Sequence, residues 1–262
     1  MYKVTSNLLR FVPRPALQSI AHRVLPIVGK IHQGDEVMCP ICEKEFARLL
    51  GYGRKQMYRA NALCPECLSL ERHRLMWLYL QRKTNFMQDE LKVLHIAPEF
   101  CFLNRFKSQK NLDYTTGDLI SPLADYHFDI HDIPFDNDSY DVVICNHVME
   151  HVEDDLKAMQ EIHRVLKPKG WAIMQVPQDY ARNKTFQDDT ITSPRDREKF
   201  YWQSDHVRLY GLDYGDRLRE AGFAVIEDHF SEELSQRRRD KHCLPPREII
   251  YLCSKRPTPP LD

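Results

Sequence analysis

Short hydrophobic runs and helical segments alternate from residue 91 onward. Two of the hydrophobic runs are 140–145 and 171–176, and between them apolar residues recur at helical spacing over 156–166. A further helix is expected near 214–221. The remaining runs with the length of strands are 92–97, 114–117, 128–130, 223–228 and 248–253. This alternation predicts a doubly wound α/β fold with a mostly parallel, seven-stranded sheet.

Local signals mark the ends of several elements. Ser69 is expected to cap a helix that continues to about residue 83. The sequence Lys167-Pro168-Lys169-Gly170 predicts the end of the preceding helix. Residues 177–203 are polar and contain few strand-forming residues. We expect them to form an excursion or lid over an active site.

The pattern divides the chain into a basic arm, a cysteine module with a bridging helix, a sheet domain and a short tail. The boundaries are 1–34, 35–88, 89–256 and 257–262. The arm has five Lys and Arg, no acid, and a helical apolar spacing that Pro26 interrupts. Such a helix makes at most weak contact with a membrane surface, and we expect it to dock on its own protein.

Charge is distributed unevenly over these parts. Residues 1–88 carry 14 Lys and Arg against 6 Asp and Glu, whereas the remainder carries 23 against 32. A basic part can face nucleic acid, anionic lipid or a phosphorylated substrate, although a solvated structural face is the commoner meaning.

Two close cysteine pairs give the most specific local signal, with Cys39 and Cys42 in one and Cys64 and Cys67 in the other. No stretch approaches the roughly 18 to 20 apolar residues of a membrane span, and the N-terminus lacks a secretory pattern. We therefore expect a cytoplasmic protein, in which paired cysteines hold metal more often than they form disulfides. Two such pairs predict a closed four-thiolate site for structural zinc.

Polar residues follow the predicted strands at the edge where open parallel sheets bind ligands. They lie at 95–99, at Asp118, at 129–132 and at 146–151. An acid after the second strand can hold both hydroxyls of a ribose, so Asp118 is a candidate nucleoside ligand. A turn or a helix cap explains an aspartate at this position equally well.

The residues from the third to the fifth strand resemble the class I S-adenosylmethionine-dependent methyltransferases, in particular their small-molecule methylating group. The segments that carry the resemblance are DIHDIPF (129–135), DSYDVVIC (138–145), VMEHV (148–152) and EIHRVLKPKG (161–170). The resemblance covers about residues 91–253, and the cysteine module and the arm lie outside it.

The resemblance implies a Rossmann-like fold with S-adenosylmethionine as cofactor. Carried over to this sequence, it implies that Asp118 binds the ribose and that Asp129 accepts a hydrogen bond from the adenine amino group. It further implies that Ile130 packs on the adenine or bonds to it through its backbone. Asn146 is expected near the methionine part of the cofactor.

The first loop departs from the family's pattern. An acid and a glycine-rich turn usually follow the first strand, but residues 95–101 contain no glycine, and Pro98 removes a donor. We expect a wider loop of His95, Ala97 and Glu99, in which Glu99 contacts the ammonium group of the cofactor. The alternative is a pocket that no longer binds the cofactor.

Methyl transfer from a sulfonium chiefly requires positioning of the nucleophile and, for a hydroxyl or an amine, removal of a proton. Histidine is the expected base, and the candidates are His147, His151 and His206. Asp205 is expected to orient His206, and Arg208 to grip an anionic substrate. Packing at a helix start or a surface turn explains these residues as well.

We therefore predict an S-adenosylmethionine-dependent methyltransferase for a small molecule, with a sugar or glycan precursor among the acceptors. One alternative is an RNA methyltransferase whose basic zinc module holds RNA, and another is a non-catalytic binding protein on the same fold. Nucleic acid is the less favoured partner, because the module lacks dense interleaving of aromatic and basic residues. The sequence does not indicate an oligomeric state.

Overall fold

The computed structural model describes residues 29–53 and 58–256, so most of the expected arm and the whole tail lie outside the described residues. The chain forms two compact units. Of the described residues, the first unit takes those up to Leu78 together with Leu234–Pro246, and the second takes Tyr79–Glu233 together with those from Arg247 onward. The division falls inside helix α3 (Glu71–Lys83).

The first unit is built on two short antiparallel strand pairs, β1 with β2 and β3 with β4. These strands are β1 (Gln33–Met38), β2 (Glu45–Phe46), β3 (Leu50–Tyr52) and β4 (Arg59–Leu63). Helix α9 (Gln236–His242) lies against β1, and its Lys241 Nζ is 3.0 Å from Glu45 Oε1.

Arg74 is fully buried and joins the segments of the first unit. Its guanidinium donates to the carbonyl oxygens of Ala62 and Ser69, both at 2.9 Å. It also donates to the carbonyl oxygens of His242 at 2.8 Å and Cys243 at 2.7 Å. Because a buried charge is tolerated only when its donors are satisfied, these bonds explain why a segment distant in sequence belongs to this unit.

The second unit contains the predicted doubly wound, seven-stranded sheet. Its strands are β5 (Leu91–Ile96), β6 (Leu112–Asp118), β7 (Tyr126–His127), β8 (Tyr140–Cys145), β9 (Leu166–Ile173), β10 (Ala224–Asp228) and β11 (Ile250–Ser254). Their order is β10-β11-β9-β8-β5-β6-β7, and β11 runs antiparallel to both of its neighbours. The strand order reverses between β5 and β8, which makes their carboxyl ends the topological switch point.

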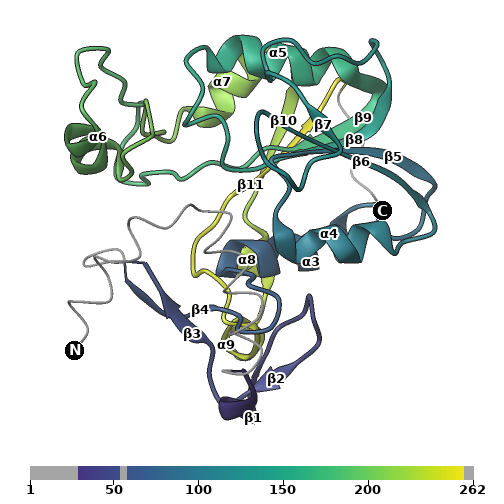
Figure 1. Ribbon diagram of the computed structural model, residues 1–262, viewed down its shortest axis with the longest axis vertical. Coiled ribbons are helices and arrows are strands. Elements are labelled where there is room, and N and C mark those ends of the chain that lie inside the picture. Colours follow the sequence, from purple (N-terminus) through teal and green to yellow (C-terminus); the bar gives the residue numbers. More distant parts are fainter. Residues whose placement is uncertain (1–28, 54–57, 257–262) are drawn as a thin grey trace. The chain divides into compact units, whose positions relative to one another are not determined.

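Helices cover both faces of this sheet. In Figure 1, α5 (Asp155–Val165) and α7 (Tyr214–Glu220) lie on one face and α4 (Phe100–Lys107) lies on the other. The short α8 (Phe230–Glu233) follows β10. Asp154 caps α5 by accepting a hydrogen bond from Lys157 N at 3.0 Å. None of the described helices combines the length and the hydropathy of a membrane-spanning segment.

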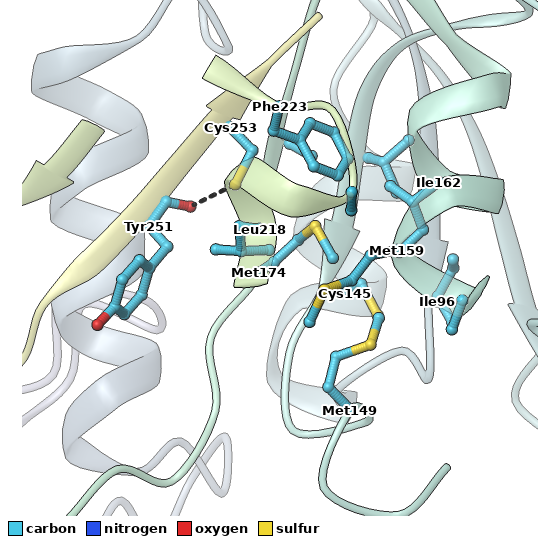
Figure 2. Packing of buried hydrophobic residues seen from close by; sticks show 14 of the residues in the cluster. Ile96, Cys145, Met149, Met159, Ile162, Met174, Leu218, Phe223, Tyr251 and Cys253 are labelled. Carbon is cyan, nitrogen blue, oxygen red and sulfur yellow. Dashed lines mark hydrogen bonds between the residues drawn. The ribbon is translucent and has the colours of Figure 1, made fainter. Parts of the chain in front are cut away.

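Sulfur-containing side chains are common in the core on the α5 and α7 face. Figure 2 shows Cys145, Met149, Met159 and Met174 packed near Leu218, and all five are buried. Unbranched methionine side chains fill irregular gaps between a twisted sheet and its helices. This packing fixes the carboxyl end of β8, which carries candidate functional residues.

Three elements differ from the sequence prediction. Residues 128–130 form a turn instead of a strand, because Asp129 Oδ1 accepts a hydrogen bond from His131 N at 2.9 Å. Helix α5 ends at Val165, as the stop signal at 167–170 predicts, but β9 begins at Leu166, five residues before the predicted strand 171–176. The polar excursion contains α6 (Pro194–Tyr201), which Ser193 caps.

Candidate functional site

The four predicted zinc ligands meet in the first unit. Cys39 Sγ lies 3.6 Å from Cys67 Sγ, and Cys42 Sγ lies 3.7 Å from Cys64 Sγ. All four sulfurs lie within 4.8 Å of one another. A tetrahedral ion with Zn–S bonds of about 2.3 Å places its sulfurs roughly 3.8 Å apart, whereas a disulfide joins them at about 2.05 Å. The cluster is therefore compatible with a zinc ion.

Ser69 lies beside this cluster instead of capping α3. Its Oγ is 3.3 Å from Cys39 Sγ and 3.2 Å from Cys67 Sγ, so the predicted cap is wrong. Hydrogen bonds from the other three cysteines lower the pKa of Cys39, whereas hydrogen bonding with Cys39 is the main cause that raises the pKa of Cys64. Because neighbouring thiolates repel, four of them can share this volume only with a cation between them.

Three of the predicted cofactor residues meet at the switch point of the sheet. The last residues of β5 and β8 pair with each other. Just beyond them, Asn146 Nδ2 donates to Glu99 Oε1 at 3.2 Å, and His95 Nε2 lies 2.5 Å from Glu99 Oε2. Both carboxylate oxygens are held, so Glu99 is fixed at the edge where sheets of this kind bind ligands.

Tyr114 extends these contacts and was missed from the sequence. Its hydroxyl lies 2.7 Å from His95 Nδ1. Burial, followed by the negative charge of Glu99, raises the pKa of Tyr114, so the hydroxyl stays protonated. The two ring nitrogens of His95 therefore link this hydroxyl to the carboxylate of Glu99. Knowledge of the strand register would have revealed this contact, because Tyr114 pairs with Val93 and therefore shares a sheet face with His95.

The loop without glycine has an alanine in the left-handed region. Ala97 has a φ of +51°, and its N–H donates to Gly117 O at 2.8 Å. This backbone conformation favours glycine and costs another residue roughly 1 kcal/mol. The loop therefore has a backbone conformation that usually requires glycine, although its sequence has none.

Asp118 ends β6, the neighbour of β5 on the side away from β8. Its Oδ1 accepts hydrogen bonds from Ile120 N at 2.8 Å and Ser121 N at 2.7 Å, which is the turn role that the sequence left open. Leu119 and Ile120 are 63% and 83% exposed. Apolar side chains beside a fixed carboxylate could cover the base of a nucleoside, and the sequence analysis did not single them out.

Asp129 and Ile130 follow β7. Asp129 is largely exposed, and its Oδ1 lies 2.6 Å from His131 Nδ1. The hydrogen bond from the backbone N–H of His131 is the main cause that lowers the pKa of Asp129. Ile130 is 7% exposed, so a ligand would reach its backbone rather than its side chain.

The three predicted histidine bases surround Glu150, a buried acid that the sequence analysis did not single out. Glu150 Oε1 lies 3.4 Å from His147 Nδ1, 3.9 Å from His151 Nε2 and 4.0 Å from His206 Nε2. Burial raises the pKa of Glu150, but the nearby imidazoles of His147 and His151 outweigh it, and the net shift is downward. Burial lowers the pKa of His206, which favours its neutral form.

Two neighbours of His206 do not have their expected roles. The carbonyl of Tyr201 accepts a hydrogen bond from His206 Nδ1 at 2.8 Å, so this carbonyl, and not Asp205, orients the imidazole. Arg208 is 1% exposed and donates from Nη1 to two carbonyl oxygens of the segment after β8, both at 2.6 Å. Buried carbonyl groups need donors, and Arg208 supplies them instead of gripping a substrate.

Residues 86–174, about a third of the chain, match the family model of a methyltransferase domain. This part includes the switch-point residues and the segment after β8. The match supports the class I methyltransferase family for this part of the chain.

Curated relatives match a shorter stretch. The demethylmenaquinone methyltransferase of Staphylococcus epidermidis is 43% identical over 47 residues, which are 18% of this chain and 20% of that protein. An uncharacterised protein of Methanocaldococcus jannaschii is 48% identical over 44 residues, or 17% of this chain and 19% of that protein. The chain spans about a fifth of the length of these relatives.

Among solved structures, the chain is similar to the 1,6-didemethyltoxoflavin-N1-methyltransferase of Burkholderia thailandensis, solved with 1,6-didemethyltoxoflavin and S-adenosylhomocysteine. The TM-score is 0.43 at 13% identity, covering 68% of this chain and 73% of that one. The [4+2]-cyclase SpnF has a TM-score of 0.46 at 15% identity, with 61% of each chain covered.

Proposed function

We propose that this chain is an S-adenosylmethionine-dependent methyltransferase that acts on a small molecule. The observation that carries the proposal is the position of Glu99, whose two oxygens are held by His95 and Asn146 at the switch point of the sheet. A fixed carboxylate at this edge is suited to bind the ammonium group of the cofactor's methionine part. The family match over residues 86–174 supports the same activity.

The other predicted cofactor residues have matching roles in this proposal. S-adenosylmethionine, when bound, supplies an activated methyl group on a sulfonium sulfur. Asp118 accepts hydrogen bonds from the ribose hydroxyls, and Asp129 accepts one from the adenine amino group. The backbone of Ile130 bonds to the adenine. The left-handed turn at Ala97 lets the backbone approach the cofactor.

His147, His151 and His206 are the proposed proton acceptors for the incoming nucleophile. The Nδ1 atoms of His151 and His206 lie 3.3 Å and 2.8 Å from backbone carbonyl oxygens, to which they can only donate. Their Nε2 atoms therefore carry lone pairs when the rings are neutral. A neutral imidazole can take the proton that a hydroxyl or an amine releases on methylation.

The four-cysteine cluster is proposed to bind structural zinc. A closed shell of four thiolates leaves no position open for chemistry, so this ion would stabilise the first unit. We favour a small-molecule acceptor over RNA because three cations of the first unit are already engaged. Arg59 pairs with Glu71 at 2.8 Å, Lys241 pairs with Glu45 at 3.0 Å, and Arg74 is buried.

Transfer of a labelled methyl group tests this function. The protein is incubated with S-adenosylmethionine that carries a trideuterated methyl group and with a small-molecule extract that includes sugar derivatives. Mass spectrometry should find a deuteromethylated small molecule, which the Asp118→Ala variant fails to form. Asp113→Ala, an exposed change on the same strand β6, should form it normally. Label found in RNA, or equal labelling by Asp118→Ala, would contradict the proposal.

A further inference from the structure

We propose that Glu150, His151 and His206 form a second metal site, which binds a divalent ion of the zinc type. One carboxylate oxygen and two imidazole nitrogens of these residues lie within 4.8 Å of one another. Two histidines and one carboxylate are a common ligand set for zinc and neighbouring first-row metals. This site is separate from the cysteine cluster and does not depend on methyl transfer.

The first argument is the burial of Glu150. Its side chain is 1% exposed, and no described donor reaches either oxygen with the distance and angle of a hydrogen bond. The nearest imidazole nitrogens lie 3.4 to 4.0 Å from Oε1, beyond the usual range of about 2.7–3.2 Å. A buried carboxylate without such partners is costly, and a cation among these side chains would compensate it.

The second argument is the orientation of the two imidazoles. His206 Nδ1 donates to the carbonyl of Tyr201, and His151 Nδ1 donates to the carbonyl of Asp205. Each ring therefore presents the lone pair of Nε2, the atom nearer to Glu150. Metal-binding histidines typically donate their other ring N–H to a carbonyl or a carboxylate in this way.

The third argument is the spacing of the ligand atoms. Metal bonds of about 2.0–2.2 Å place neighbouring ligands roughly 3 to 3.5 Å apart. The two Nε2 atoms lie 3.9 Å and 4.0 Å from Glu150 Oε1, so an inward movement of about half an ångström brings each nitrogen to this spacing from the oxygen. The rings of His151 and His206 meet edge to face, with centroids 4.7 Å apart.

One side chain must move for the ion to bind. The amide of Gln203 lies 2.8 Å from His206 Nε2 and covers its lone pair. Gln203 is exposed and can turn toward solvent. Removal of this hydrogen-bond partner should therefore leave metal binding intact or strengthen it.

The two proposed sites share one segment of the chain, because His147 to His151 directly follow Asn146, a proposed cofactor residue. Three protein ligands leave a coordination position open for an oxygen of the acceptor. This role, unlike the binding site itself, rests on the proposed methyl transfer. In it, His151 and His206 would bind the ion, and His147 would remain as the base.

The test uses the full chain with its cysteine site filled by one equivalent of Zn²⁺, as confirmed by elemental analysis. Co²⁺ is then added and followed by visible absorption. We expect one further equivalent to bind, with the weak ligand-field bands of nitrogen and oxygen ligands. Absence of such binding, or bands accompanied by the intense charge-transfer absorption of thiolate ligands, would overturn the proposal.

Variants locate the ion. Glu150→Gln and His151→Ala should each weaken Co²⁺ binding by about tenfold or more, whereas Gln203→Ala should not weaken it. His229→Ala removes another imidazole near an acid, 3.5 Å from Glu232, and should leave binding unchanged. Unchanged binding in both ligand variants would overturn the site. His151 is 33% exposed, so its variant should fold even where the Glu150 variant does not.

Binding of S-adenosylhomocysteine to the same samples separates this proposal from the preceding one. Absence of Co²⁺ binding by the wild type, with S-adenosylhomocysteine binding intact, contradicts only the metal site. Failure to bind S-adenosylhomocysteine, with Co²⁺ binding intact, contradicts only the methyltransferase.

Discussion

Left-handed backbone conformations occur at two residues just past neighbouring strands. Ala97 follows β5 with a φ of +51°, and His147 lies two residues after β8 with a φ of +56°. Such strain persists only where the surrounding structure imposes it, and it is common at functional sites. Both residues were candidates from the sequence, but their backbone conformations could not be predicted because neither is glycine.

Ala97→Gly should relieve this strain. We expect the variant to be more stable than the wild type by up to about 1 kcal/mol, because glycine adopts a positive φ without a steric cost. Urea unfolding measures the change. Ala221, with a φ of −72° at the end of α7, provides the control, and Ala221→Gly should be destabilising. A loss of stability in Ala97→Gly would contradict the strain.

His163 should make stability depend on pH. Burial, and then the charge of Lys255, lower the pKa of His163 below its unfolded value of about 6.5. As pH falls through about 6.5, the unfolded chain binds the proton first, and the folded state loses stability. Above that pH His163 is neutral in both states and does not change the free energy of unfolding. His163→Gln should therefore gain stability relative to the wild type between about pH 7.5 and pH 5, as measured by urea unfolding. A constant difference across this range would contradict the expectation.

Side-chain partners were the least predictable feature at this scale. The sequence placed His95, Glu99, Asp118 and Asn146 at strand ends, because strand ends follow from hydrophobic runs. It did not reveal Tyr114 or Glu150, because strand register and loop path decide what lies beside a given histidine.

At the scale of elements, strands and helices with a regular repeat of apolar residues were predictable. Turns and helices that depend on local hydrogen bonds of side chains were not. Met159, Ile162 and Val165 of the predicted apolar face are buried in α5, whereas Leu166, also predicted in the helix, begins β9. The turn at 128–130 was misread because Asp129 bonds to its own following backbone. Helix α6 was missed because it is exposed and lacks an apolar face, although Ser193 and Pro194 are a typical helix start.

The attachment of the α9 segment to the first unit depends on Arg74. Arg74→Met keeps much of the volume but leaves buried carbonyl groups without donors, so we expect a loss of roughly 3 kcal/mol or more in the free energy of unfolding. Arg82→Met, on the same helix α3 but exposed, should change it by less than about 0.5 kcal/mol. Equal effects of the two changes in urea unfolding would contradict the role of Arg74.

At the scale of the whole molecule, the chain forms two units with different sources of stability. The seven-stranded sheet has an extensive apolar core, whereas the first unit has short strands around four cysteines. The sequence predicted both parts. It could not show that Leu234–Pro246 belongs with the first, because long-range contacts leave no local pattern.

If the cysteine cluster holds zinc as proposed, removal of the ion should affect the two units unequally. Because metal binding stabilises a small unit that lacks a large core, chelation should speed hydrogen exchange of the backbone amides in β4. Exchange in β8 should stay slow. Mass spectrometry of peptic fragments, before and after chelation, measures both. Unchanged exchange in β4, after loss of the metal is confirmed, would show that zinc does not stabilise this unit.

Calorimetric titration of the zinc-loaded chain with S-adenosylmethionine and S-adenosylhomocysteine tests the central claim, that a loop without glycine still forms a cofactor site. We predict binding on the micromolar scale. Glu99→Gln should weaken it by about tenfold or more, because a charged partner of the ammonium is lost, and Asp113→Ala should not change it. Absence of binding by the wild type, or full binding by Glu99→Gln, would contradict the account.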